Sequence, residues 1–174
     1  MHNPPGPSTP RPAGLPPRSL ASLAEHLGVD AADGPPFDPD EPVVSGVTHD
    51  SREVLPGDLY AALPGARVHG AEFAAAVAEA GAVACLTDAA GAERAREAGL
   101  PTYVVVDPRR VLGPLAAWVY GDPAGSMTTI GVTGTNGKTT TAHLLESGLR
   151  AAGHVPGLLG TIGTRIAGED LPSV

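Results

Sequence analysis

The sequence is short of cysteine, of basic charge and of long apolar runs, and each shortage excludes a class of protein. Cys85 is the single cysteine among 174 residues, so a framework of disulfide bonds is excluded. The formal net charge is −8, which argues against a nucleic-acid partner because such partners favour a basic surface. The apolar runs stay far below the ~18 residues that a membrane-spanning helix needs, and we therefore expect no membrane partner.

The first 17 residues are rich in proline and lack the apolar central region of a signal peptide. This composition predicts a disordered tail over residues 1–17. Cys85 lies in the apolar run VACL, and we expect it to be a buried core thiol. Together these features predict a cytoplasmic protein.

Alternating apolar patterns predict one α/β domain over residues 18–122. Within it, Phe73, Val77 and Ala80 are expected on the buried face of one helix, and Pro56-Gly57 is expected to form a turn. The stretch GDPAGS at residues 121–126 has the composition of a linker. Helices are predicted over residues 19–28, 70–82, 91–99 (short and exposed) and 108–120, and strands over residues 42–49, 58–63, 83–87 and 102–106.

A second unit is predicted from residue 123 onward. The pattern indicates a strand over residues 127–133, a helix over residues 139–153 and a strand over residues 155–164. Leu144, Leu145 and Leu149 are expected to face inward from the helix. This βαβ arrangement is the start of a doubly wound sheet, but residues 123–174 are too few to complete one. We therefore expect an incomplete domain.

The stretch GVTGTNGKTTT, residues 131–141, has the layout of a phosphate-binding loop and contains the only lysine, Lys138. Its glycines would let backbone N–H groups turn toward phosphate oxygens at the start of a helix. Lys138 would reach the β and γ phosphates, and the Thr139 hydroxyl would coordinate Mg²⁺. The alternative is a glycine-rich turn that only connects a strand to a helix. The spacing corresponds to G-x-x-G-x-N-G-K-T, with Val132 where the general P-loop pattern has glycine.

Three segments resemble the Mur ligase family. TGTNGKTT resembles its ATP loop, and GVTHDSREVLPGDLYAALPGARVHGAEF resembles its uridine-nucleotide-binding motif. GLLGTIGTRIAGEDLP is similar to the branch of the family that adds a diamino acid. The branch that adds D-Ala-D-Ala remains an alternative. The resemblance implies a small N-terminal α/β uridine-nucleotide-binding domain, followed by the start of a doubly wound P-loop ATPase domain.

The resemblance also implies an activity. Members of this branch are ATP-dependent amide ligases of peptidoglycan synthesis that join diaminopimelate or lysine to UDP-MurNAc-L-Ala-D-Glu. ATP, with Mg²⁺, converts a carboxylate of the substrate to an acyl phosphate that the amine attacks. A monomer is implied. The family's further metal ligands, its carbamylated lysine and its amine-selecting domain would lie beyond residue 174. The chain by itself is therefore expected to be an inactive fragment, and a non-catalytic nucleotide-binding module is a further alternative.

The resemblance assigns roles to particular residues. Lys138 corresponds to the catalytic lysine and Thr139 to the metal contact. His69 stands where the family usually has aspartate, and Asp50-Ser51-Arg52 could also be a simple turn. The six histidines show no metal-ligand spacing. The implied ATP-binding residues are Gly134, Thr135, Asn136, Gly137, Lys138, Thr139 and Thr140, and the implied UDP-substrate-binding residues are His49, Ser51, Ala66, Arg67 and Val68.

Overall fold

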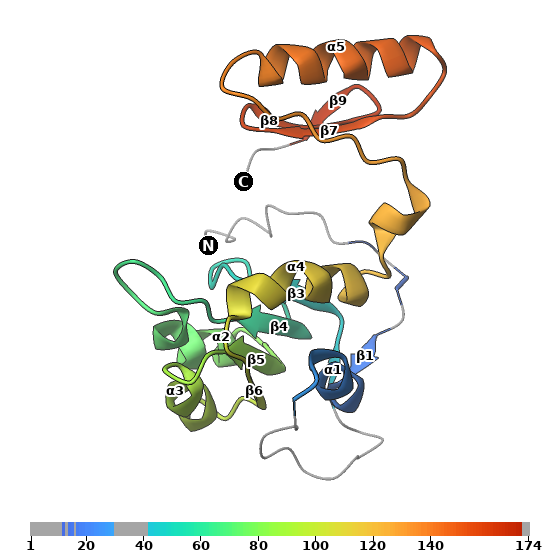
Figure 1. Ribbon diagram of the computed structural model, residues 1–174. Helices are drawn as coiled ribbons and strands as arrows, with labels where there is room; N and C mark the ends of the chain where they lie inside the picture. The colour runs from blue at the N-terminus through green and yellow to red at the C-terminus, as the bar shows by residue number, and fades with distance from the viewer. Residues whose placement is uncertain (1–11, 13, 16, 30–41, 172–174) are drawn as a thin grey trace, which may run out of the picture. The chain divides into compact units, whose positions relative to one another are not determined.

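The computed structural model describes residues 12, 14, 15, 17–29 and 42–171 (Figure 1). The predicted tail over residues 1–17 lies largely outside these residues. The described chain forms two compact units, one ending at Met127 and the other beginning at Thr128. The functional division into residues 18–122 and 123–174 stays a prediction.

The first unit is built on a parallel sheet of four strands. The strands are β3 (Gly46–Thr48), β4 (Asp58–Ala61), β5 (Ala84–Thr87) and β6 (Thr102–Val104), and they lie side by side in chain order. All three strand pairs are parallel. The predicted α/β class is confirmed, and the structure adds that the sheet is parallel.

Helices cover both faces of this sheet, as parallel sheets require. One core contains residues from α1 (Leu20–Leu27) and α4 (Pro108–Val119), and the other contains residues from η1 (Gly70–Phe73), α2 (Ala74–Glu79) and α3 (Ala92–Glu97). Successive residues of β4 alternate between them, with Leu59 in the first core and Tyr60 in the second. Cys85 is fully buried in the second core, which confirms the prediction of a core thiol.

Two of the covering helices begin and end where the sequence indicates. The Ser19 hydroxyl accepts a hydrogen bond from the N–H of Ser22 at the start of α1, and Gly28 ends that helix with φ of 64°. The carboxylate of Asp107 accepts from the N–H groups of Arg109 and Arg110 at the start of α4. The Asp107 cap fixes the first residues of α4, which begins shortly after the carboxyl end of β6.

The prediction of one strand over residues 42–49 is wrong. The segment forms β2 (Val43–Val44), which pairs antiparallel with β1 (Arg18–Ser19), and then β3, which joins the parallel sheet. Ser45 separates them, and its N–H donates to the carbonyl oxygen of Gly57 at 2.9 Å. At this residue the chain leaves one strand partner and joins another. The alternation of apolar and polar residues along the sequence does not show such a change of partner.

The predicted buried face of the helix over residues 70–82 is also wrong in part. Val77 is buried, but Phe73 and Ala80 are exposed. The buried residues are Ala71, Ala74 and Val77, at a constant spacing of three, because the segment begins as a 3₁₀ helix with three residues per turn. The helix α3 was expected to be exposed, yet its alanines Ala92 and Ala95 are buried against the sheet.

The second unit contains α5 (Lys138–Ala151) and an antiparallel sheet of β7 (Gly157–Gly160), β8 (Gly163–Ile166) and β9 (Glu169–Leu171). The helix prediction is confirmed. The predicted strand over residues 127–133 does not form, because no described strand pairs with it. The segment at residues 155–164 is a hairpin rather than one strand, since the chain turns between Gly160 and Gly163.

The inward face predicted for α5 differs from the observed one. Leu144 and Leu145 are exposed and Leu149 is half-buried, whereas Glu146 is buried. The carboxylate of Glu146 lies 3.7 Å from the guanidinium groups of both Arg150 and Arg165, so it ties α5 to β8. The spacing of apolar residues in the sequence does not predict that α5 places the Glu146 carboxylate, and not a leucine, at its most buried position.

Candidate functional site

A cavity of about 470 Å³ opens beside the carboxyl ends of β3 and β4. Ligands of open α/β sheets bind at this edge, where loops from neighbouring strands meet. The cavity is lined by His49, Asp50, Ser51, Arg52, Tyr60, Leu63, Pro64, Gly65, Val68, Gly70, Phe73 and Arg109.

The cavity brings together three of the five residues predicted to bind the UDP substrate. His49 and Ser51 follow β3, and Val68 belongs to the loop that follows β4. Ala66 and Arg67 lie in the same loop as Val68 but are exposed and do not line the cavity. The two segments meet because β3 and β4 are adjacent parallel strands.

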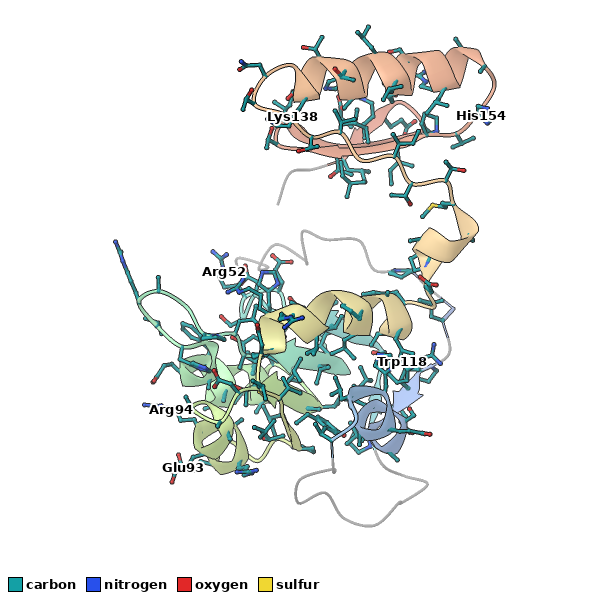
Figure 2. The ribbon with its side chains drawn as sticks, viewed as in Figure 1. Arg52, Glu93, Arg94, Trp118, Lys138 and His154 are labelled. Carbon is teal, nitrogen blue, oxygen red and sulfur yellow. The ribbon has the colours of Figure 1, made fainter. Side chains whose placement is uncertain are left out.

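The segment after β3 is a turn held by its own side chains. The Asp50 carboxylate accepts a hydrogen bond from the N–H of Arg52 at 2.9 Å and pairs with the guanidinium of the same residue. The hydrogen bonds from Arg52 lower the pKa of Asp50 to about 2. Figure 2 shows Arg52 at the outer end of this turn. The turn interpretation and the binding interpretation are therefore compatible, because Asp50 and Arg52 build the turn that carries Ser51.

The loop after β4 is fixed at its second end by close backbone packing. A Cβ atom on Gly70 would lie 2.8 Å from the backbone nitrogen of Leu63, so only glycine fits there. The buried hydroxyl of Tyr60 donates to the Gly70 carbonyl oxygen at 3.1 Å. Burial raises the pKa of Tyr60 to about 12, so this hydroxyl remains a donor at neutral pH. Gly65 has a similar steric limit, with the Val68 carbonyl oxygen 2.4 Å from its Cβ position.

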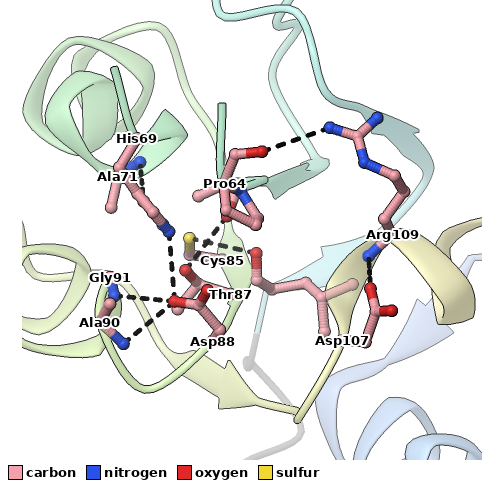
Figure 3. Close-up of polar contacts among 12 residues, drawn as sticks. Pro64, His69, Ala71, Cys85, Thr87, Asp88, Ala90, Gly91, Asp107 and Arg109 are labelled. Carbon is pink, nitrogen blue, oxygen red and sulfur yellow. Dashed lines mark hydrogen bonds and ion pairs between the residues drawn. The ribbon is translucent and has the colours of Figure 1, made fainter. Parts of the chain in front are cut away.

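His69 links the same loop to the turn after β5. Its Nδ1 accepts a hydrogen bond from the N–H of Ala71 at 3.1 Å, and its Nε2 lies 3.1 Å from the Asp88 carboxylate. Since Nδ1 is an acceptor, we assign the proton to Nε2, which donates to Asp88. Figure 3 shows the same carboxylate accepting from the N–H groups of Ala90 and Gly91.

Sequence reasoning gave no individual site role to Tyr60, Phe73 or Arg109, which also line the cavity. Tyr60 and Phe73 lie within the segment that resembles the uridine-nucleotide-binding motif, but each was interpreted as part of a strand or of a buried helix face. Arg109 carried a usable signal, because it lies in the first turn of α4, where the helix dipole disfavours a cation. A basic residue at that position calls for an explanation other than helix stability.

The glycine loop ends directly at the start of α5. Gly137 is the N-terminal boundary residue of this helix, with φ of 78°, and no side chain caps it. Gly134 also has a positive φ, of 148°. The ammonium group of Lys138 donates to the carbonyl oxygen of Gly134 within the loop (Figure 2). All residues from 134 to 140 are exposed.

These features fit a phosphate group. A helix start without a side-chain cap leaves its first N–H groups available to an anion, and two positive-φ glycines allow the backbone to curve around it. Lys138 and the Thr139 hydroxyl lie at the same helix start. Across the described ranges, no group of three or more His, Cys, Asp or Glu residues is arranged to hold a metal ion. The predicted metal contact of Thr139 therefore stays a prediction. Among the same residues, none of the helices combines the length and apolar character needed to cross a membrane.

Two family profiles match the chain. The profile described as the Mur ligase family, catalytic domain, matches residues 43–120, and the Mur ligase middle domain matches residues 132–173. The first match covers the parallel sheet and its cavity, and the second covers most of the glycine loop with α5.

Curated relatives agree with these matches. The chain is 55% identical over 167 residues to a protein of Streptomyces coelicolor named UDP-N-acetylmuramoyl-L-alanyl-D-glutamate--2,6-diaminopimelate ligase, covering 96% of this chain and 32% of that relative. It is 52% identical over 136 residues to the protein of the same name from Corynebacterium glutamicum, covering 76% of this chain and 26% of the relative. The chain thus spans about a third of the length of the relatives it matches.

Solved structures show the same likeness at lower identity. MurF from Acinetobacter baumannii has a TM-score of 0.63 and 27% identity, covering 86% of this chain and 31% of that one. A UDP-N-acetylmuramoyl-L-alanyl-D-glutamate--2,6-diaminopimelate ligase has a TM-score of 0.62 and 25% identity, covering 86% and 29%. The fold is that of an α/β protein with a cavity at the sheet edge of one unit and a glycine loop at a helix start in the other. The chain belongs to the Mur ligase family.

Proposed function

We propose that this chain supplies the UDP-substrate site and the ATP loop of a ligase that adds a diamino acid to UDP-MurNAc-L-Ala-D-Glu. The observation that carries the proposal is the 55% identity, over 96% of the chain, to a relative named for that activity with diaminopimelate. The cavity supports it, because its lining includes His49, Ser51 and Val68, which the family resemblance assigns to the UDP substrate.

In this proposal the cavity of the first unit holds the uridine nucleotide. Ser51 offers a hydroxyl from a turn that Asp50 and Arg52 hold in shape. Ala66, Arg67 and Val68 close over the nucleotide from the loop after β4. Their exposure leaves side chains and backbone groups of this loop available to a ligand.

The glycine loop of the second unit holds ATP with Mg²⁺ in this proposal. Residues 134–137 and the first N–H groups of α5 surround the phosphates, and Thr139 and Thr140 add hydroxyl groups. Lys138 leaves its contact with Gly134 and neutralises charge on the γ-phosphoryl group during transfer. That transfer converts a substrate carboxylate into an acyl phosphate, which the amine of the diamino acid then attacks with release of phosphate.

The D-Ala-D-Ala-adding branch is a weaker candidate. The MurF structures are 27–28% identical to the chain, whereas curated ligases that add diaminopimelate reach 52–55%. A 46% identical relative from Leifsonia xyli bears the general name UDP-N-acetylmuramyl-tripeptide synthetase, which does not specify the amine. We propose diaminopimelate as the amine, and a monomeric protein of the cytoplasm.

The test is a calorimetric titration of the whole chain with UDP-MurNAc-L-Ala-D-Glu. We expect saturable binding, and we expect Ser51→Ala to weaken it by about 0.5–1.5 kcal/mol, the usual value of one hydrogen bond. Ser147→Ala is the matched control, because Ser147 is exposed on α5 in the other unit. Absence of binding at millimolar substrate, in a chain with a folded circular dichroism spectrum, would refute the proposal.

A further inference from the structure

The charges around the cavity do not cancel. Asp50 and Arg52 form an ion pair with each other, and the low pKa of Asp50 keeps that carboxylate ionised, so the couple has no net charge at neutral pH. Arg109 is the other arginine of the lining, and it comes from a separate element, the first turn of α4. Among the described residues, its guanidinium has one hydrogen-bond partner, which is the neutral Pro64 carbonyl oxygen at 3.3 Å.

That single bond leaves most of the Arg109 donors available. An arginine carries five N–H donors in a planar fork, and 3.3 Å is longer than the usual 2.7–3.2 Å of a protein hydrogen bond. Figure 3 shows one terminal nitrogen directed to Pro64 while the other terminal nitrogen points away from it. The neighbouring Asp107 accepts hydrogen bonds through Oδ1 from the backbone N–H groups of Arg109 and Arg110 rather than from the Arg109 guanidinium.

We propose that Arg109 binds the diphosphate of the nucleotide that occupies this cavity. This inference rests on the proposed function, and it adds a contact that neither the sequence motifs nor the family resemblance assigned. A guanidinium fork matches two phosphate oxygens at once, which a neutral donor or a point charge does not do. A cation without an ion-pair partner at a cavity is also notable in a chain with a formal net charge of −8, because it offers a local positive charge to an anionic ligand.

The same guanidinium stays connected to the loop that is proposed to close over the nucleotide. Pro64 opens the segment that contains Gly65 and Val68, both of which line the cavity. Arg109 therefore holds one end of this loop while its remaining donors face a ligand. The two roles are separated by the ligand, because loss of the contact with Pro64 would weaken the binding of uridine and UDP alike, whereas loss of a phosphate contact would weaken the binding of UDP alone.

The experiment compares Arg109→Gln, Arg109→Lys and the wild-type chain in titrations with uridine, UDP and inorganic pyrophosphate. Arg110→Gln is the matched control, since it removes the same charge from the next residue, which is exposed and does not line the cavity. We expect Arg109→Gln to weaken UDP binding about tenfold, the low end for a charged hydrogen bond, and to leave uridine binding unchanged. Pyrophosphate should compete with UDP in the wild type but only weakly in Arg109→Gln, and Arg109→Lys should be intermediate.

Three results would overturn the inference while leaving the proposed function intact, two from Arg109→Gln and one from the Arg110→Gln control. One is an unchanged affinity of Arg109→Gln for UDP. The other is an equal loss for uridine and UDP, because Arg109 would then act only by holding the loop at Pro64. If the wild type binds neither uridine, UDP nor UDP-MurNAc-L-Ala-D-Glu, the proposed function fails and this inference fails with it. If Arg110→Gln weakens UDP binding as strongly as Arg109→Gln, the effect is one of general charge and the specific contact is refuted.

Discussion

Replacing Gly70 with alanine tests whether the loop after β4 depends on close backbone packing. The new Cβ atom would lie 2.8 Å from the Leu63 nitrogen and 2.9 Å from backbone atoms of Ala62, where ordinary contacts start near 3.4 Å. These backbone atoms directly follow β4 and cannot move aside as a flexible side chain would. The loop must therefore shift by about half an ångström away from β4.

The magnitude follows from the contacts that this shift disturbs. Overpacking of this kind costs about 1–3 kcal/mol. The shift also lengthens the bond from the Gly70 N–H to the Leu63 carbonyl oxygen and the bond from the Tyr60 hydroxyl to the Gly70 carbonyl oxygen, each worth about 1 kcal/mol. We expect the free energy of unfolding of the first unit to fall by about 3 kcal/mol, which lowers its thermal midpoint by about 10–20 °C.

The assay is thermal unfolding of the whole chain followed by circular dichroism, combined with the substrate titration. Tyr60→Phe removes only the hydroxyl bond and should lower stability by about 1 kcal/mol. Gly148→Ala is the matched control, because a Cβ atom there meets open space within α5 and should not destabilise the chain. A thermal midpoint of Gly70→Ala equal to that of the wild type would refute the steric argument. Unchanged substrate affinity in a destabilised Gly70→Ala variant would show that the loop position does not matter for binding.

Two further predictions concern charge. In a complete ligase carrying this sequence, Lys138→Ala should abolish product formation, measured by mass spectrometry, while the affinity for the UDP substrate changes by no more than about twofold. A comparable loss of affinity for the UDP substrate would contradict the assignment of ATP and the UDP substrate to separate units. Asp50→Asn should have a lower free energy of unfolding than the wild type at pH 7. This difference in stability should disappear as the pH falls from about 4 toward 2, because the pKa of Asp50 in the folded chain is depressed to about 2 and the stabilisation is lost when the carboxylate is protonated. The difference in stability should be small because the Arg52 side chain is highly exposed. Thermal unfolding at several pH values measures it. A difference that persists at pH 2 would argue against the Asp50–Arg52 pair as its cause.

Much of the first unit could be predicted from local signals. Ser19 and Gly28 mark the two ends of α1, and Asp107 with Pro108 marks the start of α4. Such capping residues are readable from the sequence because each acts within one turn of its helix. Strands β4 and β5 were located by their apolar runs. The break at Ser45 was not predicted, since it depends on which distant strand each half pairs with.

The cavity was predictable only where a family motif marked it. His49, Ser51 and Val68 were assigned from motifs, whereas Tyr60 and Phe73 carry no local sign of facing a ligand. Their position follows from the register of β4 and from the 3₁₀ start of the next helix, which are tertiary properties. In the second unit the predicted strand over residues 127–133 failed for the same reason, because a strand requires a hydrogen-bonded neighbour.

The loop after β4 is held by three different elements. Pro64 is bonded to Arg109 on α4, Gly70 to Tyr60 on β4, and His69 to Asp88 in the turn after β5. Both ends of the loop are thus anchored, and the exposed residues 65–68 lie between the anchors. Ordering one residue costs about 1–2 kcal/mol of entropy, so anchoring the ends in advance confines that cost to the short exposed tip. A ligand that binds to this loop therefore finds its two ends pre-organised. Less of the binding free energy is spent on ordering the loop, and the affinity is higher.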